Sequence, residues 1–164
     1  MDITVTARRA RIPLKRNEVK RAAARMLKAA GLRRAELSVV FLTGAEIRAL
    51  NRKYLRHDRV TDVVSFDLRD TIGLQEHKST RAQVCRSGML RPVLLCTCAP
   101  FTIDGEIYIC SSEARRNARL YGESPARELL RYLAHGILHL LGFDDATAEQ
   151  RQQMRAMEDE LLKP

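Results

Sequence analysis

The sequence predicts an α+β domain in which a small mixed sheet of four strands packs with about five helices. Short segments with apolar residues at every second position indicate the strands, and longer segments with apolar residues every three or four positions indicate the helices. Both kinds of segment occur along the 164 residues, a length that suits one domain with a core of its own. We therefore expect a single domain over residues 1–164, with an insertion at about 68–103.

In the first half of the chain, the capping signals agree with the periodicity. Ile3 and Val5 alternate with polar residues in the first strand, and Asn17 is a good N-cap for the first helix, which Gly31 ends. Thr43 and Glu46 have the spacing of a capping box at the start of the second helix. These signals predict strands at 2–6, 36–42 and 63–66 and helices at 18–30 and 44–55.

The second half of the chain begins with a stretch that has no clear periodicity. Residues 67–104 contain two glycines, two prolines and three cysteines, and a loop of this length without elements of its own is uncommon in a compact domain. We expect a mobile or poorly defined insertion there. Regular patterns then return, with a strand at 105–110, a helix at 113–120, a helix at 125–141 that begins with a proline and stops before a glycine, and a last helix at 148–162.

Charge and composition restrict the partners and the location of the protein. The chain has 29 Lys and Arg against 20 Asp and Glu, a net charge of +9, which favours a polyanionic partner such as nucleic acid. A solvated basic surface without such a partner is the alternative that charge alone leaves open. The chain has no long apolar run of the roughly 18 residues that a membrane span needs, and no apolar signal core at its N-terminus. We therefore expect a cytoplasmic protein that does not enter a membrane.

The most apolar helix carries a pattern that is typical of a catalytic zinc site. His135 and His139 are four positions apart, so on a helix that turns by about 100° per residue their rings point the same way. Gly142 suits the left-handed position that ends a helix, and the turn after it can bring Asp144 or Asp145 back toward the rings. Two histidines and one carboxylate leave one position of a zinc ion open for water, as catalytic sites do.

Two histidines at helical spacing can also be core residues with satisfied hydrogen bonds. The context favours the metal interpretation, because two of the four histidines sit in this one apolar helix, where an unpaired polar ring costs roughly 1–3 kcal/mol. Gly136 adds a second signal. A glycine inside a helix costs about 1 kcal/mol, so its position beside His135 indicates that another group approaches closely.

The segment 135–145, His-Gly-Ile-Leu-His-Leu-Leu-Gly-Phe-Asp-Asp, resembles the signature of the YbeY-type rRNA maturation factors, which are metal-dependent endoribonucleases. A second block is similar to the same family at Asn51, Tyr54, Asp58, Thr61, Asp62, Val63, Ser65 and Phe66. The chain departs from the family where Val60 replaces a frequent proline and where Leu55 stands in place of an arginine. Gly136 also occupies the position of the general-base glutamate in His-Glu-x-x-His peptidases, which leaves peptidase chemistry by that route unsupported.

The resemblance implies a zinc-dependent, single-strand-specific endoribonuclease that acts in ribosomal RNA maturation, at the small-subunit rRNA 3′ end, and in ribosome quality control. It implies a zincin-like helix and one zinc ion per chain, held by His135, His139 and Asp145, where the family carries a His or an Asp at the last position. Arginines would hold the RNA backbone, and Arg56 and Arg59 are the candidates in this chain. The implied partners are single-stranded or precursor rRNA, together with the ribosomal small subunit or assembly factors.

Two other functions fit the same residues. One is a non-catalytic, RNA-binding ribosome assembly factor with a structural zinc, and the other is a metallo-hydrolase that acts on peptides or other small substrates. An open coordination position distinguishes the nuclease from the assembly factor, and a basic rim around the metal distinguishes it from other hydrolases.

Overall fold

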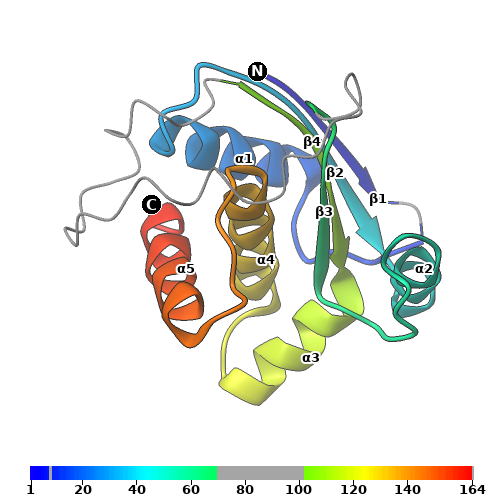
Figure 1. The fold of residues 1–164 in the computed structure, drawn as a ribbon. Coiled ribbons are helices and arrows are strands. Elements are labelled where there is room, and N and C mark those ends of the chain that lie inside the picture. The colour runs from blue at the N-terminus through cyan, green and yellow to red at the C-terminus, as the bar shows by residue number, and fades with distance from the viewer. Residues whose placement is uncertain (8, 70–101, 164) are drawn as a thin grey trace.

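The computed structural model describes residues 1–7, 9–69 and 102–163. Within these ranges the chain forms four strands, five α-helices and one π-helical turn, which confirms the predicted α+β fold (Figure 1). The strands are β1 (Asp2–Ala7), β2 (Arg34–Leu42), β3 (Val63–Asp67) and β4 (Thr102–Cys110). The helices are α1 (Arg16–Ala29), α2 (Gly44–Leu50), α3 (Ser111–Tyr121), α4 (Pro125–Leu140) and α5 (Ala148–Leu161), with the π-helical turn η1 (Asn51–Leu55) after α2.

The four strands form one mixed sheet in the order β1-β2-β4-β3. β1, β2 and β4 are parallel to one another, whereas β3 runs antiparallel to β4 at the edge. The β3–β4 pair ends where Asp67 lies opposite Gly105, and just beyond it the Leu68 amide donates to the Asp104 carbonyl at 2.9 Å. Most of the insertion predicted at 68–103, namely residues 70–101, lies outside the described residues.

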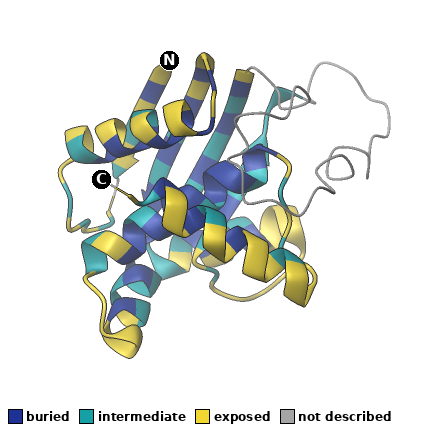
Figure 2. Cartoon of the chain, turned by 90° about the vertical axis from the view of Figure 1, so that its left-hand side faces the viewer, coloured by how far each residue is buried: buried dark blue, intermediate teal, exposed yellow. Residues whose placement is uncertain are grey.

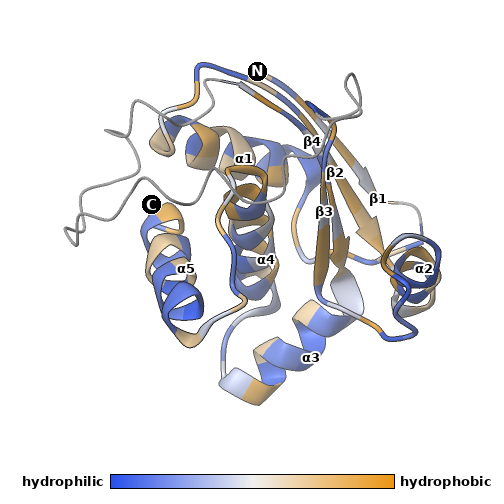
Figure 3. Cartoon of the chain, viewed as in Figure 1, coloured by the Kyte–Doolittle hydropathy of each residue, from blue (hydrophilic) through white to orange (hydrophobic). Residues whose placement is uncertain are grey.

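Helices lie against one face of the sheet and over one end of the other face (Figure 1 and Figure 3). α1 and α4 lie against one face, where alternate residues of β2 and β4, such as Phe41 and Ile107, enter the main core. α2 lies over the other face, where Ile47 and Val64 belong to a smaller apolar cluster. The two central strands are buried on both faces only at their last residues, whereas along the rest of each strand the residues on the α2 side are half-buried or exposed. None of the described helices is long and apolar enough to cross a lipid bilayer.

α4 is largely buried (Figure 2), and two glycines let it approach the sheet closely. A Cβ atom on Gly136 of α4 would lie 2.7 Å from the Ile107 side chain, and a Cβ atom on Gly105 of β4 would lie 2.8 Å from the Leu140 side chain. Ser65 of β3 donates a hydrogen bond to the Gly136 carbonyl at 3.3 Å. The close approach that Gly136 predicts is therefore confirmed, and the group that approaches is the sheet.

Some element ends differ from the sequence prediction. β4 begins at Thr102, three residues before the predicted start at 105, because Ile103 is buried and extends the apolar face of the strand. α1 begins before Asn17, which is therefore not the N-cap. The Lys15 amide instead donates to Glu18 Oε2 at 2.6 Å, which satisfies one of the free amides at the start of the helix. The helix predicted at 44–55 is α-helical in α2 and π-helical in η1.

Replacing Gly136 with alanine is expected to lower the free energy of unfolding by about 1–3 kcal/mol, because the added methyl group overlaps Ile107 in a packed core. Gly44→Ala is the matched control, because the nearest atom to a Cβ there is Ser112 Oγ at 3.4 Å. Denaturant unfolding followed by circular dichroism compares the two variants with the unmodified protein. An unchanged midpoint for Gly136→Ala would show that α4 is not held tightly against β4.

Removing residues 72–100 is expected to leave a folded protein that still binds metal. The removed segment lies between β3 and β4, which are hydrogen-bonded neighbours, so a short link can join them. The entropy of loop closure also changes slowly with loop length. Thermal unfolding and zinc binding of the shortened chain test the expectation, and loss of a cooperative transition would show that the segment belongs to the core.

Candidate metal centre

The three residues predicted as metal ligands lie together beside α4. His135 and His139 occupy successive turns of α4, and Asp145 reaches them from the loop before α5. One ligand atom from each residue lies within 4.8 Å of the other two. The two Nε2 atoms are 2.9 Å apart, and Asp145 Oδ2 is 3.8 Å from His135 Nε2. Within the described residues this is the one group of three or more histidines, cysteines or carboxylates with such spacing.

The turn that ends α4 determines where Asp145 lies. Gly142 has a φ of 91°, a conformation that favours glycine. The amides of Gly142 and Phe143 donate to carbonyls in the last turns of α4 at 2.9 and 3.0 Å, which completes a Schellman motif. Asp144 directs its carboxylate to the backbone, where Oδ1 accepts from the Asp145 amide at 2.8 Å. The side chain of Asp145, and not that of Asp144, therefore joins the two rings.

The Nδ1 atom of each imidazole ring lies beside a hydrogen-bond acceptor, and this contact determines which ring nitrogen carries the proton. His135 Nδ1 lies 2.8 Å from Glu158 Oε1, and His139 Nδ1 lies 3.0 Å from the Phe143 carbonyl oxygen. An ionised carboxylate and a carbonyl only accept hydrogen bonds. Both Nδ1 atoms therefore carry the proton of the neutral ring, and both Nε2 atoms carry a lone pair.

Two Nε2 lone pairs that face each other at 2.9 Å beside a carboxylate need a cation between them. A proton on one ring can fill this role, and so can a metal ion. Two imidazole nitrogens and one carboxylate oxygen are donors that suit zinc, and three protein donors leave one position of a tetrahedral ion open. The donor set of this chain therefore fits a zinc ion.

Nearby carboxylates raise the pKa of His135 above its ordinary value. Burial of the ring lowers this pKa, but the hydrogen bond to Glu158 and the negative charges of Glu158, Asp145 and Asp62 outweigh the effect of burial. Asp62 precedes β3 and belongs to the second block that resembles the YbeY-type family. The start of β3 thus adds negative charge near the rings, which favours a cation at this place.

Two residues at this centre, Glu158 and Arg131, were not predicted from the sequence. Glu158 of α5 and Arg131 of α4 are both buried, and Arg131 Nη1 lies 3.2 Å from Glu158 Oε2. The sequence contains a signal for each. Arg131 precedes His135 by four positions and so falls on the same side of the helix. Glu158 interrupts the buried face of α5 between Met154 and Leu161.

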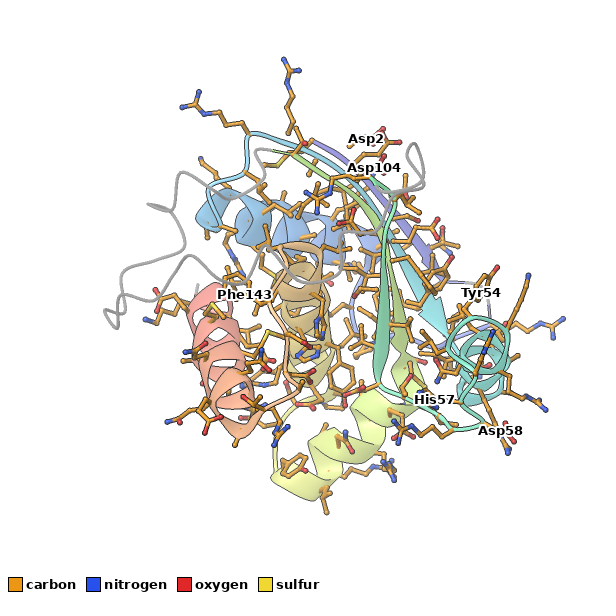
Figure 4. All side chains as sticks on the ribbon, viewed as in Figure 1. Asp2, Tyr54, His57, Asp58, Asp104 and Phe143 are labelled. Carbon is orange, nitrogen blue, oxygen red and sulfur yellow. The ribbon has the colours of Figure 1, made fainter. Side chains whose placement is uncertain are left out.

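The two arginines predicted to hold RNA do not belong to the His-His-Asp group. Arg56 and Arg59 lie in the loop between η1 and β3, whose residues His57 and Asp58 lie on the α2 side of the sheet (Figure 4). Buried Asn51 holds this loop, because its Nδ2 donates to the Arg59 carbonyl at 2.8 Å. Both arginines are exposed, and in the described part of the chain neither forms an ion pair, because Asp58 pairs with arginines of α2 and η1 instead. Their contact with RNA stays a prediction.

The fold and the centre together define a class of α+β protein built around a buried helix whose His-His-Asp group can hold a metal ion. The family model described as Endoribonuclease YbeY matches residues 4–164. Relatives named Endoribonuclease YbeY from Elusimicrobium minutum (strain Pei191) and Staphylococcus aureus (strain N315) are 35% and 37% identical over 128 residues, which cover 78% of this chain and 71% of each relative. The chain belongs to the YbeY endoribonuclease family.

A solved structure has a similar fold. The solution structure of TM1509 from Thermotoga maritima matches with a TM-score of 0.57 and 21% sequence identity, over 98% of this chain and 86% of that chain. At this identity, the likeness supports the architecture of sheet and helices and nothing finer.

Replacing Asp145 with alanine is expected to lower the zinc content of the purified protein, whereas Asp144→Ala and Asp145→His are expected to retain zinc. The Asp145 carboxylate joins the two rings, the Asp144 carboxylate bonds the turn, and an imidazole is an equally good zinc donor. Zinc per chain, measured by atomic emission after dialysis, compares the three variants. Full zinc retention by Asp145→Ala would contradict the assignment of the third ligand.

Proposed function

We propose that this protein is a zinc-dependent endoribonuclease that cuts single-stranded RNA in ribosomal RNA maturation, at the small-subunit rRNA 3′ end, and in ribosome quality control. One observation carries the proposal: two Nε2 atoms face each other at 2.9 Å beside a carboxylate, in a chain whose family is named for endoribonuclease activity. The proposed location is the cytoplasm. The proposed partners are single-stranded or precursor rRNA and the ribosomal small subunit or its assembly factors.

Three residues of the centre would hold the ion, and two further groups orient the histidine rings. His135, His139 and Asp145 would hold zinc, which when bound supplies Lewis acidity that polarises a phosphate oxygen and lowers the pKa of a nearby water. Glu158 and the Phe143 carbonyl keep the ring protons on Nδ1, so that the Nε2 lone pairs stay directed into the centre. The Asp145 side chain is 43% exposed, so solvent and substrate can reach the centre from that side.

The donor count favours a catalytic ion over a structural one. Structural zinc sites are usually closed by four protein ligands, whereas catalytic sites have three and keep one position open. The described residues contribute three donors to this group. A partly exposed, three-donor centre supports the nuclease over a non-catalytic assembly factor whose zinc only stabilises the fold.

Exposed cations offer contacts for the RNA backbone. The outer side of α1 is exposed (Figure 2), and it carries four cations that form no ion pair within the described residues: Lys20, Arg21, Arg25 and Lys28. Arg56 and Arg59 add two more in the loop before β3. Each cation that neutralises a phosphate releases counterions, so a chain of charge +9 gains an affinity for RNA that decreases with salt.

Zinc-loaded protein is expected to cleave single-stranded RNA internally, and His139→Ala is expected to lose the cleavage because one of three zinc ligands is removed. Asp144→Ala is the matched control, because the Asp144 carboxylate bonds the turn and this variant is expected to retain zinc. Fragment patterns are compared for metal-stripped and zinc-restored protein. A slow rate on isolated RNA is compatible with a ribosomal precursor as substrate. Identical fragments from the unmodified protein and His139→Ala would assign the cleavage to a contaminant and favour the assembly factor.

The double variant Arg56→Ala, Arg59→Ala is expected to bind RNA more weakly and with a smaller salt dependence. Each lost phosphate contact lowers the slope of log affinity against log salt by roughly 0.7 for single strands. Arg116→Ala, Arg127→Ala is the matched control, because both arginines are exposed but already pair with glutamates of α3 and of the turn before α4. Fluorescence anisotropy over a salt series measures the slope. Equal slopes for the two double variants and the unmodified protein would exclude Arg56 and Arg59 from the RNA site.

A further inference from the structure

A buried chain of charges connects the candidate metal centre to the C-terminal helix. Glu158 of α5 is only 5% exposed, and both of its carboxylate oxygens are used. Oε1 accepts from His135 Nδ1 at 2.8 Å, and Oε2 accepts from Arg131 Nη1 at 3.2 Å. The same Arg131 nitrogen lies 2.7 Å from Asp159 Oδ1, and Arg155 approaches Glu158 Oε2 at 3.7 Å.

The position of Glu158 in α5 would suit an apolar side chain. Met154 and Leu161, four positions before it and three after it, are buried in the main core. A carboxylate is costly to bury, and Arg131 offsets part of that cost by pairing with Glu158 and donating a hydrogen bond to it. An apolar residue would extend the core contact of α5 but could not accept the His135 proton. The Glu158 carboxylate therefore contributes more through its hydrogen bond to the His135 ring than through the packing of α5.

The contact has a defined chemical consequence for His135. A carboxylate that accepts the Nδ1 proton keeps the lone pair on Nε2, holds the ring in one orientation and makes the imidazole a stronger donor. The Nδ1 atom of His139 has only a backbone carbonyl as its hydrogen-bond acceptor. The two rings are thus supported unequally, and the charged support comes from α5.

α5 is joined to the centre at a second point. Arg151, in the first turn of α5, donates from Nη1 to the Asp145 carbonyl at 3.0 Å and to the Ala146 carbonyl at 2.8 Å. The helix therefore contacts one predicted ligand through Glu158 and the backbone of another through Arg151. Any movement of α5 away from α4 would loosen both.

We propose that Glu158, which also pairs with Arg131, is a positioning residue that raises the affinity of the centre for zinc and couples zinc binding to the docking of α5. This inference rests on the zinc centre of the proposed function. It adds that the last helix is part of the centre, and that metal and helix stabilise each other. Because coupling between two events is reciprocal, zinc must stabilise docked α5 by the same factor by which docked α5 strengthens zinc binding.

Zinc affinity measured by competition with a chromophoric chelator tests the first part. Glu158→Gln, which keeps the shape and removes the charge, is expected to weaken zinc binding by about 10–100-fold, the range typical for such supporting carboxylates. Glu160→Gln is the matched control, because Glu160 is on the same helix but exposed and paired with Lys163. Zinc affinity equal to that of the unmodified protein in a folded Glu158→Gln variant would overturn the proposal.

Hydrogen exchange on the unmodified protein tests the coupling and needs no variant. Zinc is expected to slow amide exchange in α5, while the amides of β1, the strand at the opposite edge of the sheet from β3, change little. Equal exchange of α5 with and without zinc would overturn the coupling. If the unmodified protein binds no zinc at all, the zinc centre itself fails, an outcome that is distinguishable because it appears before any variant is made.

Discussion

The close seating of α4 on the sheet is the constraint on which the rest of the structure depends. Gly136 receives the Ile107 side chain and Gly105 receives the Leu140 side chain, so each element fills a gap in the other. His135 precedes Gly136 by one residue and His139 follows it by three, so at about 100° per residue both rings lie roughly 60–100° around the helix from the sheet contact. The contact that holds α4 on the sheet thus presents the two imidazoles on the flank of the helix from a rigid support, as a metal site needs.

β3 connects this helix to the loop that precedes the strand and carries Arg56 and Arg59. Its side chains alternate between the two faces, as in any strand. Ser65 bonds the Gly136 carbonyl of α4 on one face, whereas Phe66 on the other face contacts the rings of Tyr54 and Tyr108 at centroid distances of 5.5 and 5.8 Å. The five-residue strand therefore contacts both the helix of the candidate metal centre and the turn before the arginine-bearing loop.

Charges are distributed unevenly over the molecule, with exposed cations on one part of the surface and carboxylates around the two histidine rings. The exposed cations of α1 and of the loop before β3 have no ion-pair partners among the described residues, which suits contact with a polyanion. Around the rings the opposite sign dominates, because Glu158, Asp145 and Asp62 all act on His135. Acidic surroundings favour a cation at the centre, and the cations elsewhere on the surface can compensate for the repulsion that these carboxylates exert on phosphate.

The sequence by itself determined the features that depend on neighbours within one or two turns. The four-residue spacing of His135 and His139, the glycine that ends their helix and the capping box at Thr43 are local patterns, and each is present in the structure. Tertiary structure decided the rest. Gly136 indicates a close approach but not that Ile107 makes it. The start of α1 is an exception, because the Lys15–Glu18 contact that displaced Asn17 as the N-cap is itself local. Glu158 contacts His135 across 23 positions of sequence. Such a contact could not be predicted, because hydrophobic periodicity shows which side of a helix is buried but not which other helix that side will face.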